Sequence, residues 1–120
     1  MAKSSPTRKA LKELFDQGYL PEVVEKRLPI PGKFVTRDLF NVIDILAIKP
    51  GHPVLALQVT TRDHVNHRMT KTVEKGTALT WVQTNNRFEV WGYSPTGKRT
   101  VRMLPTGNWL EIKEAEDDGG

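Results

Sequence analysis

The chain contains no cysteine, which excludes a disulfide framework and a metal site built from thiolates. It also lacks any apolar run near the roughly 18 residues that a membrane-spanning helix requires. The first residues have no apolar stretch of the kind found in a signal peptide. We therefore expect a soluble, cytoplasmic protein. Its 120 residues, of which 38% are hydrophobic, are sufficient for one domain with one core.

Charge is unevenly distributed along the chain. The whole chain has a formal net charge of +4, and residues 114–120 contain four acids and no base, so the rest carries +8. This distribution predicts a single domain over residues 1–113 followed by a disordered acidic tail over residues 114–120. A basic body favours a polyanionic partner such as DNA, and the alternative is an ordinary solubilising surface.

Turn residues and apolar spacing divide the chain into helical and extended segments. Ser5 and Pro6 are typical of a helix start, and that helix should run to Gly18. A second helix is predicted over residues 62–75, capped by Thr61 and ended by Gly76. Further strands are expected at the end of residues 19–26 and at 33–37, 79–83, 88–93, 100–104 and 109–112.

The two most apolar segments, residues 42–48 and 54–60, are separated by a five-residue turn that contains two prolines and a glycine. This pattern predicts an antiparallel hairpin whose strands are covered on both faces. The expected fold class is therefore α/β, with a mixed central sheet flanked by two helices.

Asp44 is the residue that most needs an explanation, because it lies within the first of these apolar segments. A buried carboxylate is costly unless it is paired, hydrogen-bonded or bound to a metal. If Ile48 faces Val54 across the turn, Asp44 lies opposite Gln58 in the hairpin. One interpretation is a buried hydrogen bond between Asp44 and Gln58 that fixes the strand register.

The other interpretation is a site for a divalent cation such as Mg²⁺ or Mn²⁺. Asp44 would be its central ligand, with Gln58 as an auxiliary ligand, and Asp38 or Glu25 and a carbonyl such as that of Val59 would complete the site. Such an ion activates water and neutralises charge on a phosphodiester.

The predicted helix at residues 62–75 also carries a basic edge. Val65, Met69 and Val73 form its expected apolar stripe. The basic edge lies on a different face and consists of His64, Arg68, Lys71 and Lys75. A second basic patch, formed by Lys98, Arg99 and Arg102 beside Tyr93, is a further candidate for contacts to DNA phosphates, and an ordinary solvated hairpin tip explains it equally well.

The segments from Arg37 to Ile48 and from Leu55 to Thr61, followed by the basic helix, resemble the PD-(D/E)XK nuclease superfamily. That superfamily has a restriction-endonuclease-like fold and includes Holliday-junction resolvases and VRR-type nuclease domains. The two segments are similar to those of small phage-encoded proteins of this type. The aromatic strand from Arg87 to Tyr93 adds to the resemblance.

The resemblance assigns roles to individual residues. Asp44 matches the metal-binding aspartate, whereas Gln58 and Thr60 stand where the superfamily has its second acid and its lysine. Glu13 is in the place of a helical glutamate. Lys71 or Arg68 would supply the missing positive charge, and such nucleases usually act as homodimers.

These observations together predict a metal-dependent DNA endonuclease of resolvase-like type. Asp44, Gln58 and Lys71 would form its catalytic site, Asp38 would assist the metal, and the basic side chains would follow the DNA backbone. The alternatives are a catalytically degenerate module that binds DNA or a protein partner, in a phage accessory or anti-defence role, and a structural component of a larger assembly.

Overall fold

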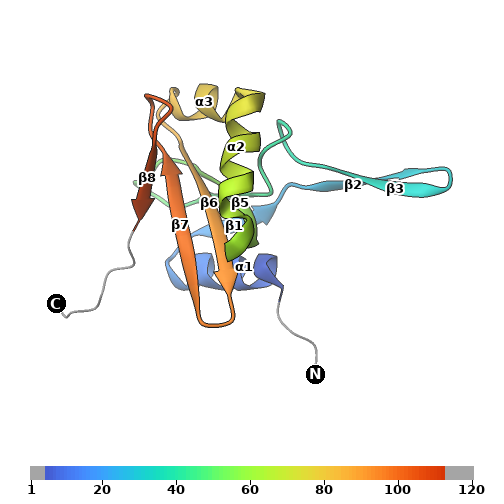
Figure 1. Ribbon diagram of the computed structural model, residues 1–120. Helices are drawn as coiled ribbons and strands as arrows, with labels where there is room; N and C mark the ends of the chain where they lie inside the picture. The colour runs from blue at the N-terminus through green and yellow to red at the C-terminus, as the bar shows by residue number, and fades with distance from the viewer. Residues whose placement is uncertain (1–4, 113–120) are drawn as a thin grey trace.

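The computed structural model describes residues 5–112, and for residues 27–30 and 33–36 it describes the backbone alone. The predicted acidic tail lies outside the described residues. At the centre is a six-stranded sheet in the order β1-β4-β5-β6-β7-β8 (Figure 1). Its strands are β1 (Leu20–Val23), β4 (Ile45–Ile48), β5 (Leu55–Thr61), β6 (Arg87–Ser94), β7 (Gly97–Met103) and β8 (Trp109–Ile112). Strands β5 and β6 are parallel and the other neighbours are antiparallel, so the predicted mixed α/β sheet is confirmed.

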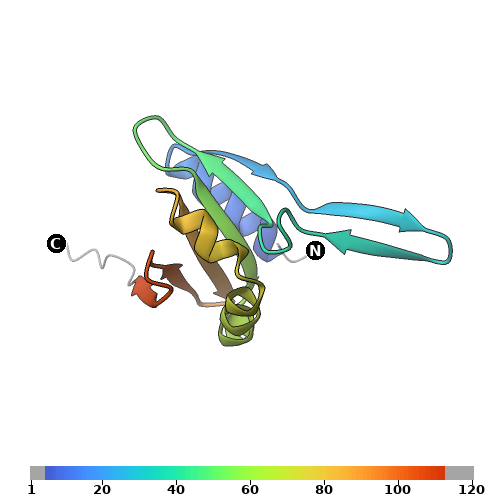
Figure 2. The same ribbon diagram turned by 90° about the horizontal axis from the view of Figure 1, so that it is seen from above.

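Helices cover both faces of this sheet. Helix α1 (Pro6–Asp16) lies on one face, and α2 (Val65–Lys75) and α3 (Thr77–Val82) lie on the other (Figure 2). A short 3₁₀ turn, η1 (Arg62–His64), precedes α2. The segment η1–α2–α3 is the crossover that a parallel pair such as β5 and β6 requires. None of the helices in the described part of the chain is both long enough and apolar enough to cross a bilayer.

Each face of the sheet has its own hydrophobic core. The core under α1 includes Ala10, Leu14, Ile45, Leu57 and Trp91. The core under α2 and α3 includes Val65, Ala78, Val82, Phe88 and Val90. Because β5 contributes alternate residues to the two cores, six of its seven residues are buried, as its apolar sequence predicted.

The ends of the predicted helices are largely confirmed. The Ser5 hydroxyl accepts a hydrogen bond from the Arg8 N–H at 3.2 Å, and Pro6 opens α1. Gly76 ends α2 in the left-handed conformation, with φ of +75°. Thr61 does lie at the start of the helical segment, but its hydroxyl contacts the side chains of Asp63 and His64 and caps no backbone N–H.

Two predictions for the helical region are wrong. Residues 79–83, expected to form a strand, belong mostly to α3, because Ala78 and Val82 at i and i+4 pack against the sheet. A short apolar run suits either structure, and packing decided between them. In α2, Val73 is 53% exposed and Thr72 is fully buried, so the face toward the sheet runs through 65, 69 and 72.

Gly92, in the middle of β6, allows α2 to approach the sheet closely. A Cβ atom at this position would lie 2.2 Å from Val65 Cγ2 and 2.9 Å from Arg62 Cα. The absence of a side chain here therefore sets the distance between the start of the crossover and the sheet.

A separate two-stranded sheet projects from the body (Figures 1 and 2). It consists of β2 (Lys26–Ile30) and β3 (Lys33–Arg37), joined by a turn in which Gly32 has φ of +86°. We call residues 26–37 the arm. The expected strand at 33–37 is confirmed, and its partner is the segment 26–30.

Candidate metal centre and basic pocket

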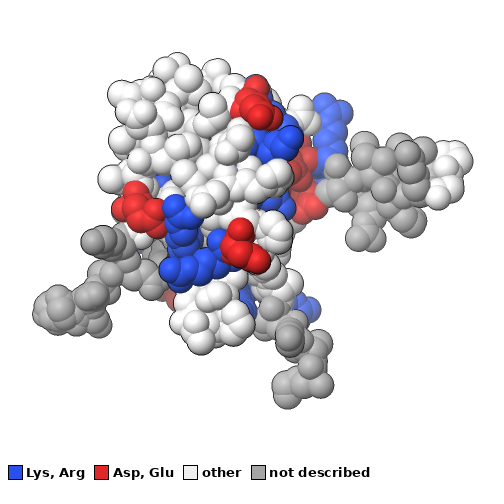
Figure 3. All heavy atoms as spheres, viewed as in Figure 1, with Lys and Arg blue, Asp and Glu red and all other residues white. Residues whose placement is uncertain are grey.

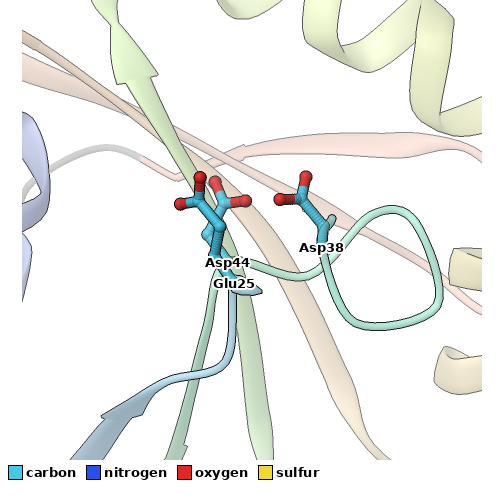
Figure 4. A group of neighbouring side chains, drawn as sticks. All are labelled: Glu25, Asp38 and Asp44. Atoms are coloured by element: carbon cyan, nitrogen blue, oxygen red, sulfur yellow. The ribbon is translucent and has the colours of Figure 1, made fainter. Parts of the chain in front are cut away.

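Three carboxylates converge where the arm joins the body. One oxygen each of Glu25, Asp38 and Asp44 lies within 4.8 Å of the others, and the carboxyl groups point to the same side (Figure 4). We call these three residues the acidic cluster. Glu25 is exposed, Asp38 is half-buried and Asp44 is 8% exposed, so the cluster reaches from the interior to solvent. A set of oxygen ligands of this kind suits a hard divalent cation.

Backbone pairing brings the cluster together from segments distant in sequence. Glu25 immediately precedes β2 and Asp38 immediately follows β3, so the two flank the first pair of the arm ladder, Lys26 with Arg37. The Val24 N–H donates to the carbonyl of Asp44 at 2.9 Å, which ties the first of these segments to Asp44.

The segment after β3 is tied to Asp44 in a similar manner. Leu39 and Ile43 form an isolated bridge, with hydrogen bonds of 3.0 and 2.9 Å in the two directions. These residues are the immediate neighbours of Asp38 and Asp44. Main-chain hydrogen bonds close to each of the three residues therefore fix the backbone from which the carboxylates extend.

Asp44 itself is anchored on β5. Its N–H donates to the Leu57 carbonyl at 2.8 Å, and its carboxylate Oδ2 accepts from the Val59 N–H at 3.0 Å. The observed register pairs Ile45 with Leu57, so its continuation places Asp44 opposite Gln58, as predicted. Asp44 lies just before β4 and not within it.

The predicted hydrogen bond between Asp44 and Gln58 is wrong. The Asp44 carboxylate bonds to the Val59 N–H, and the Gln58 Nε2 donates to the Thr72 hydroxyl at 3.2 Å. Opposite positions in the register do not ensure a hydrogen bond between the two side chains, because each of them is bonded to another group. Val59 contributes its N–H to Asp44, and its carbonyl as a ligand for the metal stays a prediction.

Burial raises the pKa of Asp44 from 3.8 to about 7, and the negative charges of Asp38 and Glu25 add to this increase. The hydrogen bond from the Val59 N–H acts in the opposite direction. The carboxyl of Asp44 is thus held where its ionised form is disfavoured. A bound cation would reverse this electrostatic effect, because it favours the charged form of all three carboxyls.

Gln58 presents an unsatisfied acceptor beside this cluster. Its Oε1 is the single buried side-chain nitrogen or oxygen atom in the described part of the chain that has no hydrogen-bond partner. A buried acceptor left unpaired destabilises the fold by about 1–3 kcal/mol. No atom of the described residues pairs with it, so it is free to accept a hydrogen bond from water or to coordinate a cation.

A basic pocket of about 400 Å³ lies between the sheet and α2. Asp38, Asn41, Gln58 and Thr60 line it from the sheet and the adjoining loop. The opposite wall consists of His64, His67, Arg68, Lys71 and Lys75. The four residues of the predicted basic edge thus do line one surface. Asp38 belongs to both features, so the acidic cluster and the basic pocket are continuous. On the surface, acidic and basic side chains lie together where the arm meets the body (Figure 3).

The basic side chains of the pocket have different partners. Lys75 Nζ donates to the Asn41 carbonyl at 2.9 Å, which fixes the loop between Asp38 and Asp44. Lys71 Nζ lies 3.8 Å from the exposed Glu74 carboxylate, a weak contact that leaves its charge available to the pocket. Lys75 is therefore a structural residue as well as a source of positive charge.

The structure does not bring Lys98 and Arg99 to this pocket. Lys98 pairs with Glu13, lies 3.6 Å from the centroid of the Trp91 ring, and has a side chain only 10% exposed. Arg99 binds the Glu111 carboxylate, with its Nε at 3.0 Å. Both side chains have carboxylate partners within the chain, and their contact with DNA phosphates stays a prediction.

Glu13 also lies away from the acidic cluster. Besides Lys98, it accepts a hydrogen bond from the Tyr93 hydroxyl at 2.8 Å on the α1 face of the sheet. Asn41 is a pocket residue that the sequence reasoning missed. The residue type is the one signal in the sequence, because asparagine tolerates the left-handed conformation that Asn41 adopts, with φ of +65°.

Comparison with models of known protein families found no match, and neither the curated proteins nor the solved structures contain a significantly similar chain.

Proposed function

We propose that this protein is a metal-dependent DNA endonuclease of resolvase-like type with a restriction-endonuclease-like fold. The observation that carries the proposal is the continuity of the acidic cluster with the basic pocket through Asp38. A phosphodiester held by the basic wall would lie next to oxygen ligands suited to Mg²⁺ or Mn²⁺. Metal-dependent cleavage of a phosphodiester is served by such an arrangement, because the ion then lies beside the bound phosphate.

Each side chain has a distinct part in this proposal. Asp44, Asp38 and Glu25 would hold the cation, with Gln58 Oε1 as a neutral fourth oxygen. The cation would lower the pKa of a bound water and neutralise charge on the phosphate.

The basic wall would hold the DNA. Arg68 and His64 would bind backbone phosphates, and Lys71 would supply the positive charge that the neutral Thr60 does not. Lys75 would keep the loop after Asp38 in place through its bond to Asn41. Two cuts in a branched DNA require two such sites, so we further propose a homodimer.

Cleavage is the direct test. The protein is incubated with supercoiled, branched and single-stranded DNA in Mg²⁺, in Mn²⁺ and in chelator. We expect nicking that requires the cation and is abolished by Asp44→Asn. Asp16→Asn is the matched control, because Asp16 is an exposed aspartate on α1. Nicking that survives Asp44→Asn would refute the proposed site.

The second candidate is a degenerate nuclease fold that binds DNA without cutting it. Two observations favour it: the Gln58 amide is hydrogen-bonded to Thr72, and Thr60 carries no charge. It predicts DNA binding that weakens with salt but is indifferent to divalent cations and to Asp44→Asn. Binding to neither DNA nor cation would instead direct attention to a protein partner.

A further inference from the structure

We infer that a groove between Phe40 and α3 binds one unpaired nucleobase of the DNA strand held in the basic pocket. This inference rests on the proposed function in one respect, because it takes DNA as the ligand. It adds to the proposed endonuclease a site that recognises a base, and therefore a preference for DNA that contains an unpaired base.

The groove has the size and chemistry of a small-molecule site. Its volume of about 330 Å³ lies at the lower end of the usual range for ligand pockets, roughly 300–1,000 Å³. The residues that line it are Phe40, Thr77, Thr80, Trp81, Thr84 and Asn86. Two are aromatic, four carry hydroxyl or amide groups, and none is charged. A phosphate is therefore a poor ligand here, and the flat, neutral part of a nucleotide is a suitable one.

Trp81 is fixed in place before any ligand arrives. Its indole Nε1 donates to the Arg87 carbonyl at 2.7 Å, and the Thr84 hydroxyl donates to the Trp81 carbonyl at 2.7 Å. The ring is half-buried against the core under α2 and α3. Such a wall loses little conformational freedom when a base stacks on it.

Phe40 is held toward solvent by a backbone conformation that bulky residues rarely adopt. Its φ is +52°, Asn41 follows at +65°, and Phe40 is 56% exposed. The Thr77 hydroxyl donates to the Phe40 carbonyl at 3.0 Å, and Lys75 Nζ donates to that of Asn41. Two side chains thus maintain a strained turn that keeps an aromatic ring out of the core, which is typical of a functional contact.

The groove adjoins the site already described. Phe40 is two residues after Asp38, and Asn41 lines the basic pocket. A strand whose phosphate lies in the basic pocket would therefore bring a neighbouring base to Phe40. In a paired duplex that base is stacked and unavailable, whereas at a junction, gap or single-stranded segment it is free to enter.

The test measures binding in chelator, so that cleavage is not required. Duplexes and gapped DNAs carrying one 2-aminopurine are titrated with the protein, because this fluorescent base is quenched when it stacks. The variant is Phe40→Gly, since glycine suits the positive φ and removes only the ring. Phe15→Ala is the matched control, because Phe15 is 62% exposed on α1, on the opposite face of the sheet. Phe40→Tyr should restore binding.

We expect Phe40→Gly to weaken binding of gapped DNA by about 5- to 150-fold, the range measured for loss of one base stacking on an aromatic ring. Binding of the fully paired duplex should change less than twofold, and Phe15→Ala should affect neither. Equal loss on both DNAs, or no loss on gapped DNA, would overturn the inference while leaving the proposed function intact. Failure of the wild-type protein to bind any DNA would overturn both. Equally strong, Phe40-dependent binding of a free nucleoside monophosphate would show that the groove takes free nucleotides and not strand-borne bases.

Discussion

Replacing Asp44 by asparagine should make the protein more stable at alkaline pH when divalent cations are absent. In the folded state the pKa of Asp44 is raised to about 7, from 3.8 in an unfolded chain. The folded state therefore binds the proton more tightly, so the wild-type protein loses stability as pH rises from about 4 to about 7. Integrated over this shift, the loss is about 4 kcal/mol. The asparagine side chain would keep an acceptor for the Val59 N–H without a charge.

Urea denaturation at pH 5 and pH 8, with chelator or with Mg²⁺, measures this effect. In chelator the variant should exceed the wild type by up to about 4 kcal/mol at pH 8, and the difference should decrease toward pH 5. Adding Mg²⁺ should stabilise the wild type by about 2.7 kcal/mol at a concentration of 100 times the Kd, and the variant much less. A variant less stable than the wild type at pH 8 in chelator would refute the reasoning, because Asp44 would then be a structural residue.

Two further predictions separate packing from binding. Gly92→Ala should destabilise the fold by about 1–3 kcal/mol, because the added Cβ would overlap Val65 Cγ2. Gly97→Ala is the control and should change the melting temperature little, because a Cβ at that position has its nearest contact at 3.5 Å. Arg68→Met should weaken DNA binding and reduce the slope of its salt dependence by about 1, whereas Lys98→Met should leave that slope unchanged, because Lys98 is paired with Glu13.

Features governed by short-range rules could be predicted from the sequence. The turn between two apolar segments gave the β4–β5 register, and with it the position of Asp44 opposite Gln58. Helical spacing placed His64, Arg68, Lys71 and Lys75 along one surface, because the period of an α-helix depends on local geometry alone.

Features decided by distant partners could not be predicted. Lys98 and Glu13 are 85 residues apart in the sequence, so nothing near Lys98 indicates that its charge is neutralised. The choice of strand or helix at residues 79–83 depended on a packing surface that other segments supply. The partner of Gln58 could not be predicted either. Its amide donates to Thr72 on α2, and the sequence predicts where that helix lies along the chain but not which of its faces packs against the sheet.

The attachment of the arm has a consequence for how this protein can vary. Glu25 and Asp38 are next to Lys26 and Arg37, the first residue pair of the arm. The distance between the two carboxylates therefore depends on this first pair and not on the far end of the arm. Adding or removing one residue from each strand would lengthen or shorten the arm and leave the two carboxylates facing each other. An unmatched deletion in one strand would slide the ladder and draw one of them away. Homologous chains should therefore tolerate arms of different length as long as the two strands change together.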